Sequence, residues 1–123
     1  MLFSPQVNVY YYQEADGTCP VREFLLAQPA RVQAQAEARV RLLSERGNEL
    51  RRPQAENLGG GIWELRWRTG KVQYRILYCF HGRGAALLLH GLIKEGRVPD
   101  AAIARAQRRR QLFLQNPTHH TKP

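Results

Sequence analysis

Residues 57–95, NLGGGIWELRWRTGKVQYRILYCFHGRGAALLLHGLIKE, decide the fold of this chain. Within this stretch, residues 62–68 alternate between apolar and charged side chains, which is the period of a β-strand with two different faces. Gly70 supplies a position that tolerates positive φ, as a tight turn requires. Residues 71–80 then alternate again. The pattern predicts two antiparallel strands joined as a hairpin.

A third strand follows directly. Residues 81–84, His-Gly-Arg-Gly, have the composition of a second tight turn. Residues 85–93 are apolar except for His90, and such a run is typical of a central strand that is covered on both faces. The three strands therefore predict a meander, whose rigid backbone would hold any functional side chain in a fixed position.

The flanking segments contribute one more strand and three helices. Residues 7–13 are rich in Val and Tyr, which favours an opening strand. Pro20 and Pro29 stand where the first turn of a helix tolerates proline. The second of these helices is expected to end near Gly47, which suits a left-handed C-terminal cap. Apolar residues recur at helical spacing from residue 100 to about residue 114, which predicts a last helix.

The predicted order is strand, helix, helix, strand, strand, strand, helix. This order predicts an α+β domain in which the helices pack on a twisted, mainly antiparallel sheet. We expect residues 1–115 to form a single domain and residues 48–56 to be an irregular connection into the sheet. Residues 116–123 have no apolar periodicity and are predicted to form a flexible, frayed tail.

Composition excludes several classes of protein. The chain has 123 residues, which suits one domain, and it contains no run near the roughly 18 apolar residues that a membrane span needs. Residues 1–5 do not resemble the start of a secretory signal. Cys19 and Cys79 are too few and too far apart for a metal motif. We therefore expect a cytoplasmic protein with two free thiols, without a membrane segment, a metal or a small-molecule cofactor.

The net charge of +9 lies entirely in the second half of the chain. Residues 1–57 contain seven Arg and seven acidic residues, whereas residues 58–123 contain twelve Lys and Arg against Glu64, Glu95 and Asp100. Such asymmetry favours a polyanionic partner, either a nucleic acid or an acidic protein. The alternative is a basic surface that only keeps the protein soluble and its copies apart.

The familiar catalytic motifs for phosphate loops, zinc proteases and serine hydrolases are missing from the sequence. What remains is a group of cations that neighbouring strands would bring to one concave face, namely Arg66, Arg75 and Lys94. Such cations can bind a phosphodiester and stabilise the charge that develops during its cleavage. RNA supplies its own nucleophile, the 2′-hydroxyl, so an enzyme of this kind needs no metal. Cys79 is expected to be a core thiol with a raised pKa.

Several short motifs match a known family in the family's own order. They are Pro20-Val21-Arg22-Glu23-Phe24-Leu25, Leu58-x-Gly60-x-Ile62-Trp63-Glu64-Leu65-Arg66, Tyr74-Arg75-Ile76-Leu77-Tyr78, Leu88-Leu89-His90-Gly91-Leu92-Ile93-Lys94, and Pro99 ahead of Ala106-x-x-Arg109. In these motifs the chain resembles the phage-derived HigB-type toxins of the RelE/ParE superfamily. The resemblance covers most of the chain and implies a RelE/ParE-like fold.

The resemblance also implies a function. It implies the toxin of a type II toxin–antitoxin system, a metal-independent endoribonuclease (mRNA interferase) that cuts mRNA on the ribosome and so inhibits translation. The implied protein partner is a helix-turn-helix antitoxin. By resemblance, Arg75 contacts the scissile phosphate, while Arg66 and Lys94 take the other two catalytic positions. The sequence departs from the family at Glu95, where a second basic residue is usual, and Arg97 is the expected substitute.

We therefore expect Arg75 to neutralise the phosphate, Arg66 to position it, and Lys94 to stabilise the transition state or protonate the leaving oxygen. The expected RNA-binding residues beside them are Arg68, Lys71 and Arg97. Further candidates are His90, Tyr78 and Arg109. His90 is either a core histidine or a base, and the expected partner of Arg109 is Glu64. Two other functions remain open, because fold does not settle function: a ParE-like inhibitor of DNA gyrase, and an inactive relative that only binds its antitoxin.

Overall fold

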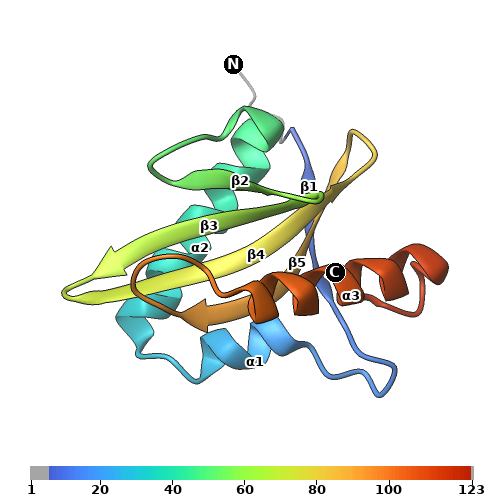
Figure 1. The fold of residues 1–123 in the computed structure, drawn as a ribbon, viewed down its shortest axis with the longest axis horizontal. Coiled ribbons are helices and arrows are strands. Elements are labelled where there is room, and N and C mark those ends of the chain that lie inside the picture. Colours follow the sequence, from blue (N-terminus) through green and yellow to red (C-terminus); the bar gives the residue numbers. More distant parts are fainter. Residues whose placement is uncertain (1–5, 123) are drawn as a thin grey trace.

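The computed structural model describes residues 6–122, which form one six-stranded sheet and three α-helices (Figure 1). Residues 1–5, on which the signal-sequence prediction depends, lie outside the described residues. The elements in chain order are β1 (Asn8–Tyr12), α1 (Pro20–Leu26), α2 (Ala30–Arg46), a 3-10 turn (Gly47–Glu49), β2 (Ala55–Gly59), β3 (Ile62–Thr69), β4 (Val72–His81), β5 (Ala85–Ile93), α3 (Asp100–Gln115) and β6 (Thr121–Lys122).

The strands lie in the order β2-β3-β4-β5-β1-β6. Strands β2 to β5 form an antiparallel meander, whereas β1 pairs with β5 in the parallel direction. The three strands predicted from residues 57–95 are confirmed, and β5 has the predicted bounds. The turns between them contain Gly70 and Gly82, both with a φ of 60°. The fold class is thus mixed α+β, as expected.

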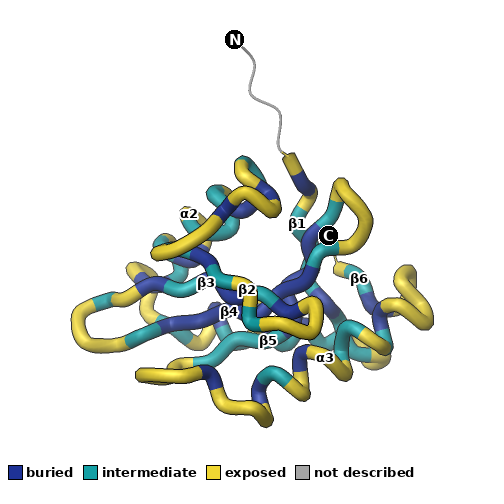
Figure 2. Tube along the Cα trace, turned by 45° about the horizontal axis from the view of Figure 1, so that its top comes forward, coloured by how far each residue is buried: buried dark blue, intermediate teal, exposed yellow. Residues whose placement is uncertain are grey.

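Helices cover both faces of the sheet, and each face has its own apolar core (Figures 1 and 2). On the α2 face, side chains of α1 and α2 pack on Leu65, Ile76 and Leu88. On the α3 face, side chains of α3 pack on Leu77 and Leu89. Strand β5 supplies residues to both cores, which is why its sequence is apolar almost without interruption.

The helix boundaries follow the predicted signals. Helix α2 has Pro29 at its N-cap and ends at Gly47, whose φ of 56° lies in the left-handed region that favours glycine. Its buried residues, Val32, Ala36 and Leu43, recur at helical spacing. Helix α3 has a similar inner stripe. Within the described residues 6–122, the helices are too short or too polar to cross a membrane.

The turn between β2 and β3 explains the glycine run. Gly60 and Gly61 both have positive φ, and both lie against α3. A Cβ atom on Gly60 would lie 2.5 Å from Nε2 of Gln107, and one on Gly61 would lie 3.0 Å from the guanidinium of Arg110. Glycine at these two positions lets α3 approach the end of the hairpin closely.

Two expectations are corrected by the structure. Residues 48–56 are not wholly irregular, because β2 begins at Ala55 and pairs with β3. Its sequence lacks alternation, and the edge of β3 supplies the hydrogen-bonding partners instead.

The tail after Gln115 is not simply frayed, since β6 pairs with β1. The ring of His120 stacks on Tyr12 at 5.3 Å between centroids, and this contact holds the segment in place.

Candidate functional site

The α3 face carries the cations that the sequence singles out. Arg66 on β3 stands directly opposite Arg75 on β4, and Glu64 stands opposite Leu77, whose side chain belongs to the α3-face core. Cross-strand partners project to the same face of a sheet. Lys94 follows the end of β5, and its backbone N–H donates to the carbonyl of Gln73 at 3.1 Å. The meander therefore brings Arg66 and Arg75 together and places Lys94 at the edge of the same region.

Arg75 is held by three groups of the protein itself. Its Nη1 donates to Oε2 of Glu64 at 3.0 Å, its Nε donates to the carbonyl of Lys94 at 3.1 Å, and its Nη2 donates to the carbonyl of Gly96. Arg75 is 6% exposed and Glu64 is 1% exposed. Burial raises the pKa of the Glu64 carboxyl, and the guanidinium of Arg75 opposes that rise. In this conformation Arg75 fixes the chain after β5 and is not open to a phosphate.

Only part of the Arg66 side chain is engaged by other groups of the protein. Its Nε donates to the carbonyl of Pro53 at 3.0 Å, and its Nη1 lies 3.3 Å from Glu56 and 3.6 Å from Glu64. About a quarter of its side chain, 26%, is exposed. Arg66 therefore has both a fixed stem and a solvent-facing edge.

The outer cations form exposed ion pairs. Arg68 holds Glu95 through two hydrogen bonds of 2.9 and 3.1 Å, and the side chains are 50% and 61% exposed. These bonds keep the pKa of Glu95 below its ordinary value. Arg97 pairs with Asp100 at 2.8 Å, also in solvent. Exposed pairs of this kind contribute little to stability and can exchange partners.

Lys71 and Lys94 are exposed and form no ion pair within 4.0 Å among residues 6–122. Glu64, Glu95 and Asp100 are the acidic residues of residues 58–123, and each pairs with a cation predicted for the site. The α3 face is therefore less positive locally than the sequence suggests. Among the cations predicted for the site, Lys71 and Lys94 have no acidic partner within the described residues and remain open to a ligand.

The further candidates lie apart from this region. Tyr78 is fully buried in the α2-face core, on the other side of the sheet, where burial raises its pKa. Arg109 pairs with Glu14 at 3.3 Å, so the prediction that it pairs with Glu64 is wrong. The physical reason is that Arg75 and Arg66 already surround Glu64.

His90 lies beside Arg109, whose Nη1 is 3.2 Å from Nδ1 of the imidazole. Burial, together with the nearby charges of Arg109 and Arg105, lowers the pKa of His90 to about 4. Because Arg109 can only donate, Nδ1 of His90 is the accepting nitrogen and the ring is neutral near pH 7. Cys79 is buried, and burial raises its pKa to about 11, which confirms the expected core thiol. Among residues 6–122, no three His, Cys, Asp or Glu side chains gather closely enough to hold a metal ion.

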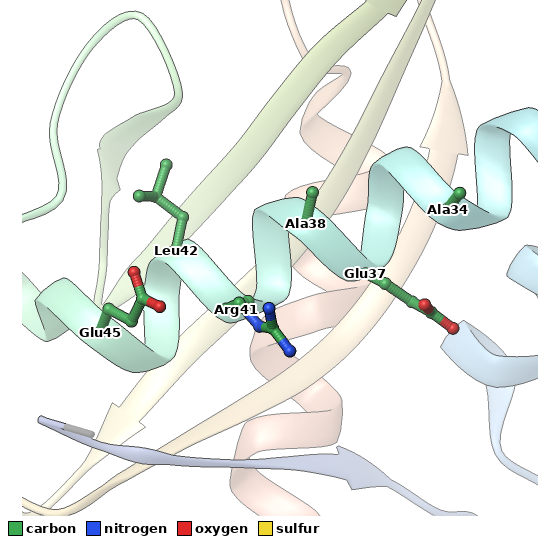
Figure 3. A pocket seen from close by; sticks show the side chains of 6 residues that line it. All are labelled: Ala34, Glu37, Ala38, Arg41, Leu42 and Glu45. Atoms are coloured by element: carbon green, nitrogen blue, oxygen red, sulfur yellow. The ribbon is translucent and has the colours of Figure 1, made fainter. Parts of the chain in front are cut away.

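Two residues that the sequence did not single out for a site lie beside this region. Arg39 on α2 and Trp67 on β3 line a cavity of about 320 Å³ together with Arg66 and Arg68. In the sequence Arg39 looks like one more solvated residue of an amphipathic helix, and no local pattern shows that it reaches the sheet edge. The outer side of α2 has a separate shallow cavity of about 370 Å³, along which Glu37, Arg41 and Glu45 are placed (Figure 3). That surface contains none of the predicted site residues.

The sequence of this chain matches a family model, and the matched residues include the strands that carry the predicted site. A family model described as "Phage derived protein Gp49-like (DUF891)" matches residues 23–111, which is more than half of the chain. The match begins in α1 and ends in α3, so it includes every strand from β2 to β5. A search of curated proteins found no match.

Proposed function

This chain belongs to the phage-derived Gp49-like family, which is RelE/HigB-like in general and often provides toxins of toxin–antitoxin systems, and from that premise we propose that it is such a toxin. We propose further that it is a HigB-type protein with a RelE/ParE-like topology that cuts mRNA on the ribosome and so inhibits translation. Its site of action is then the cytoplasm, and its protein partner is a helix-turn-helix antitoxin.

The proposed reaction uses the RNA's own 2′-oxygen. This oxygen attacks the adjacent phosphorus, the bond from phosphorus to the 5′-oxygen breaks, and the products are a 2′,3′-cyclic phosphate and a 5′-hydroxyl. The protein has to orient the phosphate and stabilise the added negative charge, which fixed cations do well. Neither task requires a metal or a cofactor.

Roles for individual residues follow from exposure. We assign the contact with the phosphate to Lys94 and to the exposed edge of Arg66, with Arg68, Lys71 and Arg97 beside them on the RNA. Arg75 becomes a positioning residue, because it holds the carbonyls of Lys94 and Gly96 and is itself buried. This assignment replaces the direct contact of Arg75 with the phosphate that the family resemblance implies.

Family membership is the observation that carries the proposal, and the exposed cations of the α3 face support its chemistry. The test is induced expression in bacteria, with primer extension on a reporter mRNA. Wild-type protein should arrest growth and create new 5′ ends. Lys94→Ala should reduce the new ends at least about tenfold, because it removes a cation next to the developing charge. Arg83→Ala, which removes an exposed cation in the turn between β4 and β5, should cut like wild type.

A ParE-like inhibitor of DNA gyrase is the second candidate function. It is favoured by Arg105 and Arg108, two exposed cations on α3 that lie outside the proposed site. If wild-type protein arrests growth without new 5′ ends in the reporter, the nuclease proposal fails and gyrase inhibition takes its place. Absence of growth arrest would instead indicate an inactive relative, in which the pairing of Glu95 with Arg68 has replaced a basic pair.

A further inference from the structure

A cationic groove lies at the open edge of β3, where the short edge strand β2 no longer covers it. The first residue pair between the two strands is Ala55 with Leu65, and the backbone N–H of Arg66 still donates to the carbonyl of Gln54. Beyond that point, the last residues of β3 pair with β4 alone among the described strands. The resulting cavity of about 320 Å³ reaches from this edge to α2.

The side chains around this groove are unusually rich in hydrogen-bond donors. Three arginines line it, Arg39 from α2 and Arg66 and Arg68 from β3, and no carboxylate of residues 6–122 does. Arg66 and Arg68 have acidic partners outside the groove, whereas Arg39 has no ion pair within 4.0 Å among residues 6–122. The groove therefore has one arginine whose charge nothing in the described chain neutralises.

Two donors in the walls of the groove also lack acceptors. Nε of Arg39 and Nε1 of Trp67 are both buried from water, and neither has a hydrogen-bond partner within residues 6–122. Trp67 is 3% exposed. Buried donors are nearly always paired in folded proteins, so two unpaired donors on residues that line one cavity call for an explanation. Neither atom is open to solvent, so a ligand with acceptor atoms and negative charge would pair with them once the side chains of Arg39 and Trp67 turn towards it.

We propose that this groove binds a phosphate group and that Arg39 makes the decisive contact with it. A phosphate presents several acceptor oxygens in different directions, which matches donors that converge from α2 and β3. The volume lies at the lower end of the range for small-ligand pockets, as suits one nucleotide. Arg66 and Arg68 belong both to the groove and to the α3 face. An RNA strand bound on that face would therefore continue into the groove. Assigning the phosphate to an RNA backbone rests on the proposed function, whereas phosphate binding itself does not.

The experiment follows the two indole N–H signals in ¹H–¹⁵N NMR spectra of the full chain. Trp67 lines the groove, and Trp63 serves as the internal reference because it lies elsewhere, under Arg51. The ligand is a short RNA with 2′-O-methyl groups, which cannot be cut because its nucleophile is blocked. We expect saturable movement of the Trp67 signal and little movement of the Trp63 signal. Inorganic phosphate is the second ligand, and a polyglutamate peptide is the third.

The matched variants are Arg39→Ala and Arg41→Ala, which remove the same charge from the same helix. Arg41 lies along the outer cavity of α2 and not in the groove. Arg39→Ala should weaken RNA binding at least about fivefold, and Arg41→Ala less than about twofold, since only the first removes a direct phosphate contact. Dispersed spectra of each variant will show that it is folded.

Each outcome decides the proposal. Tighter binding of RNA than of inorganic phosphate assigns the groove to an RNA backbone, and equal binding assigns it to free phosphate. The proposal is overturned if neither ligand moves the Trp67 signal, if the two variants weaken binding equally, or if polyglutamate binds more tightly than both. Since no cleavage is measured, a groove that depends on Arg39 would stand even if the primer-extension test rejected the nuclease.

Discussion

Two arginine–glutamate pairs on the same sheet face differ mainly in burial. Glu64 and Arg75 meet at 3.0 Å with side chains 1% and 8% exposed, whereas Arg68 and Glu95 meet at 2.9 Å with side chains 50% and 61% exposed. The contacts are chemically alike, but a buried charge that loses its partner stays in a medium that solvates it poorly. An exposed charge regains water. The inner pair is therefore a fixed part of the fold, and the outer pair can be exchanged for a ligand.

The largest expected effect is on stability, from breaking the inner pair. Arg75→Ala leaves the buried carboxylate of Glu64 with only the longer contact of 3.6 Å to Arg66, and it removes the hydrogen bonds to the carbonyls of Lys94 and Gly96. We expect the free energy of unfolding to fall by about 3–5 kcal/mol. Arg68→Ala removes the same side chain from the outer pair and should change stability too little to resolve. Urea unfolding of both variants at pH 7 checks the difference.

A double variant separates the loss of the pair from the loss of a side chain. In Glu64→Gln with Arg75→Met, no charge remains buried without a partner, so the double variant should recover a large part of the stability lost in Arg75→Ala. If Arg75→Ala were as mild as Arg68→Ala, Arg75 would not be a fixed part of the fold. It would then be available to a phosphate, as the family resemblance implies.

The strands that carry these two pairs could be predicted from the sequence, but the buried pair itself could not. Alternation with a period of two predicts β3 and β4 almost to the residue, and a continuous apolar run predicts β5, which supplies side chains to both cores. The same alternation places Arg66 and Arg75 on one face. It cannot show that residues 94–96 turn back over Arg75, because that contact depends on the connection into α3 and not on the strands. The buried pair is therefore invisible in the sequence.

The elements that the sequence did not predict have their partners far away along the chain. Strand β2 has no alternation of its own and forms on the edge of β3. The last strand forms because the backbone of Gln13 bonds to His120 and Tyr12 stacks on its ring. Arg39 is a similar case, since the spacing of α2 shows that it lies outside the main apolar stripe but not that β3 ends beside it. Local patterns carry no information about such distant partners.

Arg109, a partly buried cation of the α3 face, gives a pH-dependent prediction of intermediate size. Its contact with His90 is possible only while the imidazole is neutral, and the pKa of His90 is lowered to about 4 in the folded protein. In the unfolded chain the pKa is about 6.5. The unfolded state therefore binds the extra proton first, and the stability due to neutral His90 is complete above pH 6.5 and is lost as the pH falls towards 4.

After allowance for partial solvent exposure, we expect this loss to be about 1–2 kcal/mol between pH 6.5 and pH 4. Thermal unfolding at a series of pH values measures it. His90→Asn keeps an acceptor close to Arg109 but does not titrate, so the difference between the two proteins isolates the imidazole from other acidic groups. Parallel pH profiles for the two proteins would show that His90 titrates normally and is not a buried core histidine.

The smallest expected effect is a change in RNA affinity when the exposed ion pair of Arg68 and Glu95 is removed. Glu95→Gln removes the carboxylate that occupies Arg68, so the guanidinium no longer has to exchange one anion for another when RNA binds. We expect affinity for the 2′-O-methyl RNA to rise about threefold, and the rise to shrink with added salt because the site is exposed to solvent. The control is Glu37→Gln, which removes the same charge from the outer side of α2 (Figure 3). An equal gain in both variants would mean that only net charge matters. A gain confined to Glu95→Gln would mean that Glu95 itself limits the occupancy of Arg68 by RNA, at the position where the family resemblance implies a basic residue.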